Sequence, residues 1–452
     1  MNRASPLTRT EEHPARFDLA KEHPSLESPA VIIFAPPWPR SGTARVIQNQ
    51  IQYYHERGYF TVLIAVPFLQ YLVYVDPREL VDGLNELGAD RTFMATLGQR
   101  AFTAARYKAS VRYAFSGTVL DWHVAAGKAA RLRDADLNFL RRLPTVLFHV
   151  NHVYTLGFAL HLRRRLTADR WPLPIILETH DVQAHLLQER GDCNPWTRRH
   201  DRLERLIKSE IKSLEKANVL IHLSVDDFKF FQRFLPSKPQ FLALPTIDEN
   251  FIHDANAIFP QAEHFDLLFV GRWHSPNLAA VNWFFGQVWP LIADRRYTVR
   301  IVGPVGSMVQ QELPQLYDTF RSCFVGEVAD LIPSYRAARC VIAPMVSGSG
   351  ISIKTIEALA LGKPFVGTSK AFRGMPMDRL KEAGIQEHDE PQAFADAIVR
   401  TLCNEHEAQA LSEAAYEKVF SVKASYVSRD EAVRAATVSP LRIPLPRRFK
   451  LL

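Results

Sequence analysis

The chain has 452 residues, of which 47% are hydrophobic and 23% are charged. This length and composition exclude a single small domain and a largely disordered chain, and they favour two or three folded domains. The formal net charge is +7, and residues 91–215 carry 21 Lys and Arg against 12 Asp and Glu, so we expect anionic partners.

The first 28 residues are polar and charged and contain no apolar core, so they predict a flexible segment without a secretory signal. The longest uncharged apolar run, Tyr59–Val75, is broken by Pro67 and Gln70 and is shorter than the ~20 residues of a membrane-spanning helix. The cysteines are far apart and form no CxxC pair, which favours a reducing compartment. We therefore predict a cytoplasmic protein. Its Arg163–Arg165 cluster favours peripheral contact with the inner face of a membrane over nucleic acid, because no aromatic-interleaved RNA module is present, and plain solvation is the simpler alternative.

Short apolar runs alternate with amphipathic helical patterns over residues 29–245. The runs that we predict as buried parallel strands are Val31–Ala35, Phe60–Val66, Thr145–His149, Pro174–Leu177 and Val219–Leu223. Helices are expected over Ala44–Arg57, Leu156–Leu166 and Arg202–Lys216. This alternation predicts a doubly wound, Rossmann-like α/β domain.

Residues 246–264 are rich in Pro, Asp and Asn and are interpreted as a linker. The alternation then resumes and predicts a second Rossmann-like domain over residues 265–404. A C-terminal helix over Glu405–Phe420 and a basic, proline-rich tail complete residues 405–452. Because ligands of such sheets bind outside the carboxyl ends of the strands, two facing sheets predict a cleft that can hold two substrates.

A glycine- and serine-rich loop, Gly348–Gly350, separates a buried strand from a helix that begins near Ile351. Backbone N–H groups of such a loop and the helix N-terminus together form an anion site. Lys354 and Glu357 are three residues apart and share a face of the helix. The lysine can neutralise a diphosphate and the glutamate can accept two sugar hydroxyls; the alternative is a solvated ion pair on an ordinary helix.

Gly271 and Arg272 end the first strand of the second half, so the arginine is expected to point into the cleft. Its planar guanidinium suits a bidentate grip on phosphate, and an interdomain salt bridge is the alternative. Ser275 or Asn277 is expected to cap the helix that follows. The turn that contains Val328 follows another strand and can take a nucleobase against main-chain groups.

Polar residues also follow two strands of the first half, where His152 ends one cluster and His180 and Asp181 end another. We predict that His152, and then His180, faces the substrates; the alternative is that these histidines bond backbone groups. A metal site is disfavoured because no carboxylate cluster completes it. Asp134 and Asp136 spell a DxD sequence, but they lie in a helical, charged stretch, so we predict no metal or other cofactor.

The segments of the second half resemble, in order, the group 1 (family 4-like) glycosyltransferases, which are retaining enzymes of the GT-B fold. The segments that carry this resemblance are FVGRWHSPN, VRIVG, FVGEVADLIPSYRAARCVIAP and GSGISIKTIEALALGKPFV. The resemblance implies two Rossmann-like domains that face each other across a cleft, with the C-terminal helix returning to the N-terminal domain. It also implies a hexosyltransferase-type reaction, in which a sugar moves from a nucleotide-diphosphate donor to a glycan, lipid-linked or small-molecule acceptor with retained configuration.

Matched by position, the resemblance implies that Glu357 binds the donor ribose and that Arg272 binds the diphosphate. Arg272, Lys354 and His152 are then the expected catalytic residues, and His180 and Asp181 are expected on the acceptor side. The other residues expected around the donor are Gly42, Gly271, Val328, Gly348, Ser349, Gly350 and Ile351.

Two departures from the family pattern matter. The first glutamate of the family's E-x7-E motif is replaced by Ser349, and the family's lysine after the Gly-Arg pair is replaced near Asn277. Lys354 is expected to supply the lost positive charge. The missing carboxylate supports an alternative, a non-catalytic GT-B-like scaffold that binds a nucleotide or glycan; a sugar phosphorylase or epimerase is a third reading.

Overall fold

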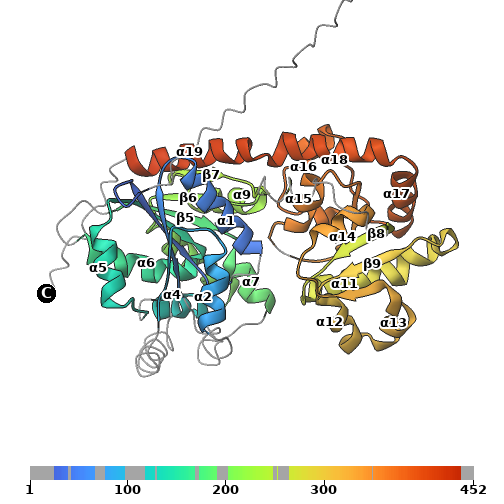
Figure 1. The fold of residues 1–452 in the computed structure, drawn as a ribbon, viewed down its shortest axis with the longest axis horizontal. Helices are drawn as coiled ribbons and strands as arrows, with labels where there is room; N and C mark the ends of the chain where they lie inside the picture. The colour runs from blue at the N-terminus through green and yellow to red at the C-terminus, as the bar shows by residue number, and fades with distance from the viewer. Residues whose placement is uncertain are drawn as a thin grey trace, which may run out of the picture.

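The structure, a computed structural model, describes residues 25–38, 42–66, 77–96, 118–127, 130–167, 173–190, 202–247, 252, 264–348 and 350–438. These residues form two α/β lobes that lie side by side, and two C-terminal helices run along one side of both lobes (Figure 1). Ser349, most of the linker, the first 24 residues and the basic tail after residue 438 lie outside the described residues.

The first lobe is built on a parallel sheet whose described strands have the order β3-β2-β1-β4-β5-β6-β7. These strands are β1 (Ala30–Ala35), β2 (Phe60–Ala65), β3 (Arg91–Met94), β4 (Thr145–Asn151), β5 (Ile175–Thr179), β6 (Val219–His222) and β7 (Gln240–Leu242). The order reverses direction between β1 and β4, which places a ligand crevice at the carboxyl ends of these strands.

Helices cover both faces of this sheet, which is why β1 and β2 are apolar and buried along their whole length. The helices are α1 (Gly42–His55), α2 (Pro77–Asn85), α4 (Val119–Gly127), α5 (Asp134–Arg142), α6 (His152–Leu166), α7 (Gln183–Arg190), α8 (Leu203–Leu214) and α9 (Val225–Phe234). Alternate residues of β1 enter two different cores. Ile32 and Phe34 pack in the core that includes α4 and α6, whereas Val31 and Ile33 pack in the core that includes α1.

The second lobe has a parallel sheet whose described strands have the order β10-β9-β8-β11-β12. They are β8 (Phe265–Val270), β9 (Val299–Val302), β10 (Phe324–Gly326), β11 (Ala338–Ala343) and β12 (Phe365–Gly367). Its α-helices are α11 (Ser275–Trp283), α12 (Val305–Glu312), α13 (Pro314–Thr319), α14 (Ile332–Ala337), α15 (Ile353–Ala360), α16 (Met377–Glu382) and α17 (Pro391–Cys403). Short π and 3-10 turns are η1 (Phe284–Val288), η2 (Trp289–Leu291), η3 (Ala293–Arg295), η4 (Arg321–Cys323) and η5 (Ser369–Phe372).

The C-terminal region contains two helices, of which the sequence pattern predicted one. Helix α18 (Glu405–Phe420) has the predicted bounds and packs on the second lobe, whereas α19 (Val422–Val438) was missed and packs on β5, β6 and β7 of the first lobe. The buried face of α19 is mixed: Tyr426, Ala432 and Ala436 join the core that includes α1, while Ser425 and Arg429 are also buried, so the apolar stripe is short and interrupted. The helix thus returns to the N-terminal lobe, as the resemblance implied.

The two chain segments that connect the lobes contact each other. The Tyr416 hydroxyl at the end of α18 lies 2.9 Å from Thr246 Oγ1 and accepts a hydrogen bond of 3.3 Å from the Ile247 backbone N–H. The Asn49 side chain of α1 donates to the Thr246 carbonyl. The segment that leaves the first lobe is therefore hydrogen-bonded both to α18 and to α1. Within the described residues, no helix combines the length and the apolar composition needed to cross a membrane.

Candidate active site

The carboxyl ends of the two sheets meet at a pair of glycines. Gly42, the first residue of α1, faces Ile353, the first residue of α15, so closely that a Cβ at Gly42 would lie 3.3 Å from Ile353 Cγ1. Gly350 has a φ of +65°, and a Cβ there would lie 2.1 Å from Asp181 Oδ1 at the end of β5. The structure therefore brings Gly42, Gly350, Ile353 and Asp181 together from two lobes.

A second contact between the lobes lies beside these glycines. The backbone N–H of Val225 at the start of α9 donates to the Gly374 carbonyl over 2.8 Å. The Gly374 N–H in turn donates to Asp226 Oδ2 over 3.2 Å. These reciprocal bonds hold the segment between η5 and α16 against the first lobe. The contact between the lobes therefore includes specific hydrogen bonds.

Lys354 lies in the first turn of α15, which begins at Ile353, two residues later than predicted. Its Nζ donates to Asn277 Oδ1 over 2.6 Å and lies 4.6 Å from the centroid of the Phe269 ring. Burial, and next the charge of Arg373, lower the pKa of Lys354 from 10.5 to about 7. An anion brought to this ammonium would raise that pKa again.

Asn277 connects Lys354 to the end of β8. Its Nδ2 donates to the Arg272 carbonyl over 3.0 Å, while its Oδ1 accepts from Lys354. The prediction that Ser275 or Asn277 caps α11 is wrong, because His274 occupies the N-cap and makes no side-chain capping bond. Arg272 follows the strand, as expected, with an exposed side chain that forms no ion pair with any described residue. The alternative of an interdomain salt bridge for Arg272 is therefore not supported.

Glu357 lies one turn deeper on α15 and is buried. It accepts a hydrogen bond of 3.1 Å from the Tyr335 hydroxyl, and its Oε1 lies 3.5 Å from Arg45 Nε of α1. Burial raises the pKa of Glu357, and the charge of Arg45 opposes this shift. The alternative of a solvated Lys354–Glu357 pair is therefore wrong. The turn at Val328 packs against the hydrophobic cluster that includes Tyr335, the hydrogen-bond partner of Glu357.

Two cations of this site, Arg45 and Arg373, were missed by sequence reasoning. Arg373 lies against the Gly348 backbone, where an added Cβ would be 3.3 Å from the guanidinium carbon. Burial lowers the pKa of Arg373, and the Asp181 carboxylate opposes that shift. Arg373 sits in an irregular segment after η5, so no periodicity could have indicated it. Arg45 was weakly indicated by the sequence, because it lies in the first turn of the helix that starts at Gly42.

His152 and His180 lie together at the carboxyl ends of β4 and β5. Their rings stack with centroids 4.0 Å apart, and the Trp38 ring meets His152 edge-on at 5.1 Å. His152 starts α6, four residues earlier than predicted, with a φ of 61° that is rare outside glycine. Its buried Nδ1 has no hydrogen-bond partner among the described residues. Such an orphaned polar atom beside backbone strain is typical of a ligand site.

Both histidines are uncharged at neutral pH. Burial lowers the pKa of His180 from 6.5 to about 4. Burial and the neighbouring His180 lower the pKa of His152 well below its ordinary value. The Nε2 of His180 lies 2.9 Å from Asn151 Oδ1, a side-chain partner and not a backbone group.

The DxD sequence lies at the start of α5, as the helical pattern predicted. Asp136 is paired with Arg133 over 2.8 Å on that helix. In the part of the chain that the structure describes, no group of three or more His, Cys, Asp or Glu side chains is arranged to hold a metal ion.

Two facing parallel sheets with crossing C-terminal helices define a protein of the GT-B fold. Residues 264–404, which form the second lobe, match the family model described as glycosyl transferases group 1. This match confirms, for the second lobe, the family resemblance predicted from the sequence, and the two sheets with the solved structures below confirm the predicted fold class.

Solved structures match the chain over nearly all of its length. Sucrose-phosphate synthase from Thermosynechococcus elongatus is 16% identical, with a TM-score of 0.59 over 90% of this chain and 98% of that one. HepE from Anabaena, solved in complex with UDP and glucose, is 14% identical, with a TM-score of 0.57 over 89% and 98%. An α,α-trehalose-phosphate synthase (UDP-forming) from Burkholderia vietnamiensis is 14% identical, with a TM-score of 0.54 over 91% and 100%. At these identities the matches establish the fold. No curated protein matches the chain in sequence.

Proposed function

We propose that this protein is a retaining glycosyltransferase that uses a nucleotide-diphosphate-sugar donor and a glycan, lipid-linked or small-molecule acceptor. One observation carries the proposal: Lys354, Arg373 and the Gly348–Gly350 loop meet Gly42 and Asp181 where the two sheets face each other. A main-chain loop at a helix N-terminus with adjacent cations suits a diphosphate. The matches to structures whose titles name UDP, UDP-glucose or UDP-forming activity support the same donor class.

In this proposal Arg272 and Lys354 stabilise the charge that develops on the departing nucleotide diphosphate. The bond between the anomeric carbon and the phosphate oxygen breaks, and a bond to the acceptor oxygen forms on the same face of the sugar. The acceptor proton passes to a phosphate oxygen of the donor, so no protein nucleophile is required. Side-chain cations act here in place of a metal, because fixed charges in a water-poor cleft stabilise developing charge strongly.

The remaining residues divide between the two substrates. Glu357 is proposed to exchange its contact with Arg45 for the donor ribose, because a carboxylate can accept both ribose hydroxyls. His152 offers its unpaired Nδ1 to a sugar hydroxyl, and His180 and Asp181 border the acceptor. Contact with a membrane surface would bring a lipid-linked acceptor to this side of the cleft.

A thermal-shift screen of nucleotide sugars tests the donor site. The wild type should be stabilised by one donor class, by about 2.7 kcal/mol when the donor is at 100 times its Kd. Lys354→Ala and Glu357→Gln should each lose most of that stabilisation. If both variants keep all of it, the site assignment is wrong. Binding by the wild type without turnover, across donors and acceptors, would instead favour the non-catalytic scaffold.

Donor affinity should depend on pH through Lys354. In the free protein, Lys354 loses its proton above about pH 7. The two negative charges of a bound diphosphate diester do not change over this range, so they would keep Lys354 protonated in the complex. Affinity should therefore be constant below pH 7 and fall about tenfold per pH unit above it. Isothermal titration calorimetry in buffers of different ionisation enthalpy should show proton uptake at pH 8. Lys354→Met should remove both the pH dependence and the proton uptake.

A further inference from the structure

A buried ion pair joins the C-terminal helix to the strand that carries His180. Arg429 of α19 donates through Nη1 to Glu178 Oε2 over 2.6 Å and through Nη2 to Oε1 over 3.3 Å. The side chains are 3% and 0% exposed, so neither charge is screened by water. Burial alone would raise the pKa of Glu178, but the charge of Arg429 and the bond from His149 outweigh it and lower that pKa. Glu178 is therefore a carboxylate.

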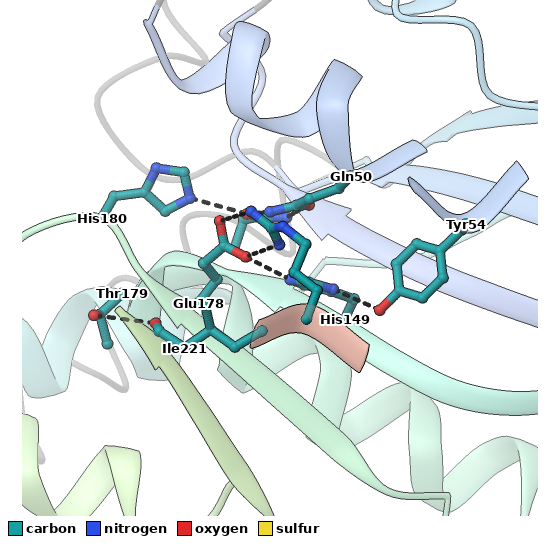
Figure 2. A network of polar contacts seen from close by, with 9 residues as sticks. Gln50, Tyr54, His149, Glu178, Thr179, His180 and Ile221 are labelled. Carbon is teal, nitrogen blue, oxygen red and sulfur yellow. Dashed lines mark hydrogen bonds and ion pairs between the residues drawn. The ribbon is translucent and has the colours of Figure 1, made fainter. Parts of the chain in front are cut away.

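The ionised Glu178 determines the proton position on His149. His149 Nε2 lies 3.1 Å from Glu178 Oε2, and His149 Nδ1 lies 2.8 Å from the Tyr54 hydroxyl oxygen. A carboxylate only accepts hydrogen bonds, so Nε2 carries the proton and Nδ1 accepts from Tyr54. Burial lowers the pKa of His149 and keeps the ring neutral. Figure 2 shows Tyr54, His149 and Glu178 in this line.

The same reasoning fixes the proton of His180. Gln50 and Asn151 form a reciprocal amide pair, with bonds of 2.8 and 2.9 Å. Asn151 Oδ1, the acceptor in that pair, also faces His180 Nε2 at 2.9 Å. His180 therefore donates from Nε2 and keeps an unprotonated Nδ1. Figure 2 shows Gln50, His180 and Glu178 in one network of polar contacts.

Glu178 is the common negative charge for four histidines of this lobe. Its carboxylate acts to raise the pKa of His149, His152, His180 and His222. Arg429 acts in the opposite direction on His149 and His180.

The other charged groups packed here do not replace Arg429. Asp430 of α19 is engaged by the Tyr53 hydroxyl of α1 and by Arg57, which follows that helix. The phenols of Tyr53 and Tyr54 stay protonated, because burial raises the pKa of both. Arg429 is therefore the cation that hydrogen-bonds Glu178.

We propose that Arg429 is a positioning residue for the active site proposed above: by balancing the charge of Glu178, it keeps His149 and His180 neutral with their protons on Nε2. The C-terminal helix thus has a chemical role in the first lobe in addition to its packing. Without Arg429, the unpaired carboxylate draws a proton onto His149, its hydrogen-bond partner. The Tyr54 hydroxyl must then turn, and the neutral histidine arrangement beside the cleft is lost.

The test compares Arg429→Met with the charge-balanced double variant Glu178→Met/Arg429→Met and with Arg429→Lys. Histidine side chains are labelled with 13C and 15N in the full-length protein, and their NMR signals are followed from pH 5 to 8.5 without substrate. Signals are assigned with His149→Gln and His180→Gln. In the wild type both rings should titrate below the ordinary histidine range, with the pKa of His180 at about 4. In Arg429→Met the His149 midpoint should rise by about one to three pH units. The double variant and Arg429→Lys should keep both rings neutral over the same pH range as the wild type.

The pH dependence of the melting temperature provides a second test if Arg429→Met folds poorly at neutral pH. A histidine whose pKa is raised in the folded state stabilises that state below its unfolded value and loses the effect as pH rises. Arg429→Met should therefore gain melting temperature between pH 8 and pH 5.5 relative to the double variant. The proposal would be overturned if the melting temperature of Arg429→Met differed from that of the double variant by the same amount at every pH. It would also be overturned if the His149 titration of Arg429→Met were unchanged. Neither readout involves sugar transfer, so failure of the proposed function would be seen separately, as absence of turnover by the wild type.

Discussion

Replacement of Lys354 by methionine should lower the rate of glycosyl transfer by about 10²–10³-fold. The ammonium is partly buried at the N-terminus of α15, held by Asn277 Oδ1 and the Phe269 ring, so its charge is fixed before the reaction begins. Methionine retains most of the side-chain volume and removes the charge. The loss should appear both in kcat and in the KM for the donor, because the charge binds the diphosphate before the reaction and stabilises it further as it departs. Initial rates of nucleoside diphosphate release measure it.

Lys423→Met is the matched control, because Lys423 is an exposed lysine of α19 and is not one of the residues proposed to bind the substrates. It should transfer sugar at the wild-type rate. Lys354→Arg keeps a cation of different shape and should recover part of the lost rate. A Lys354→Met protein that transfers sugar as fast as the wild type would remove Lys354 from the mechanism.

Gly350→Ala should lower transfer by about 10²-fold, because it disturbs the contact between the glycine loop and the first lobe. The added Cβ would meet Asp181 Oδ1 at 2.1 Å, and the φ of +65° suits glycine. Either the Asp181 side chain turns away or the loop shifts from the first lobe, and in both cases Asp181 and the loop no longer converge. Transfer assays report the rate, and small-angle X-ray scattering reports any increase in the radius of gyration.

Gly58→Ala is the control that distinguishes the effect of backbone strain from the effect of the steric collision in Gly350→Ala. Gly58 also has a left-handed φ, +76°, but nothing lies within 4 Å of an added Cβ. Both variants should lose about 1–2 kcal/mol of stability from the backbone strain, and Gly58→Ala alone should keep full transfer. Asp181→Ala combined with Gly350→Ala removes the colliding carboxylate and should restore the compact scattering profile. If the profile stays expanded, the Gly350–Asp181 contact does not control the approach of the lobes.

The cations of the site have different origins in the sequence. Arg272 and Lys354 each follow a strand or loop that the sequence pattern identifies. Arg45 and Arg373 come from a helix of the opposite lobe and from an irregular segment, and they reach the site only through packing. A local pattern indicates where a side chain leaves its own element; it carries no information on which element of the other lobe lies opposite.

The sequence by itself determined the two parallel sheets, because strands buried on both faces must be continuous apolar runs. It also determined the glycine loop before α15 and the polar residues after β4, β5 and β8, since these are local to strand ends. Only the tertiary structure decided the partners: Asn277 bridges Lys354 and Arg272 instead of capping its helix, and Arg429 meets Glu178 across 251 residues. Helix α19 shows the reason most clearly. Its buried face mixes Tyr426 and alanines with Ser425 and Arg429, so its place also depends on the partners of Arg429 and Asp430 in the first lobe, which no periodicity in the chain encodes.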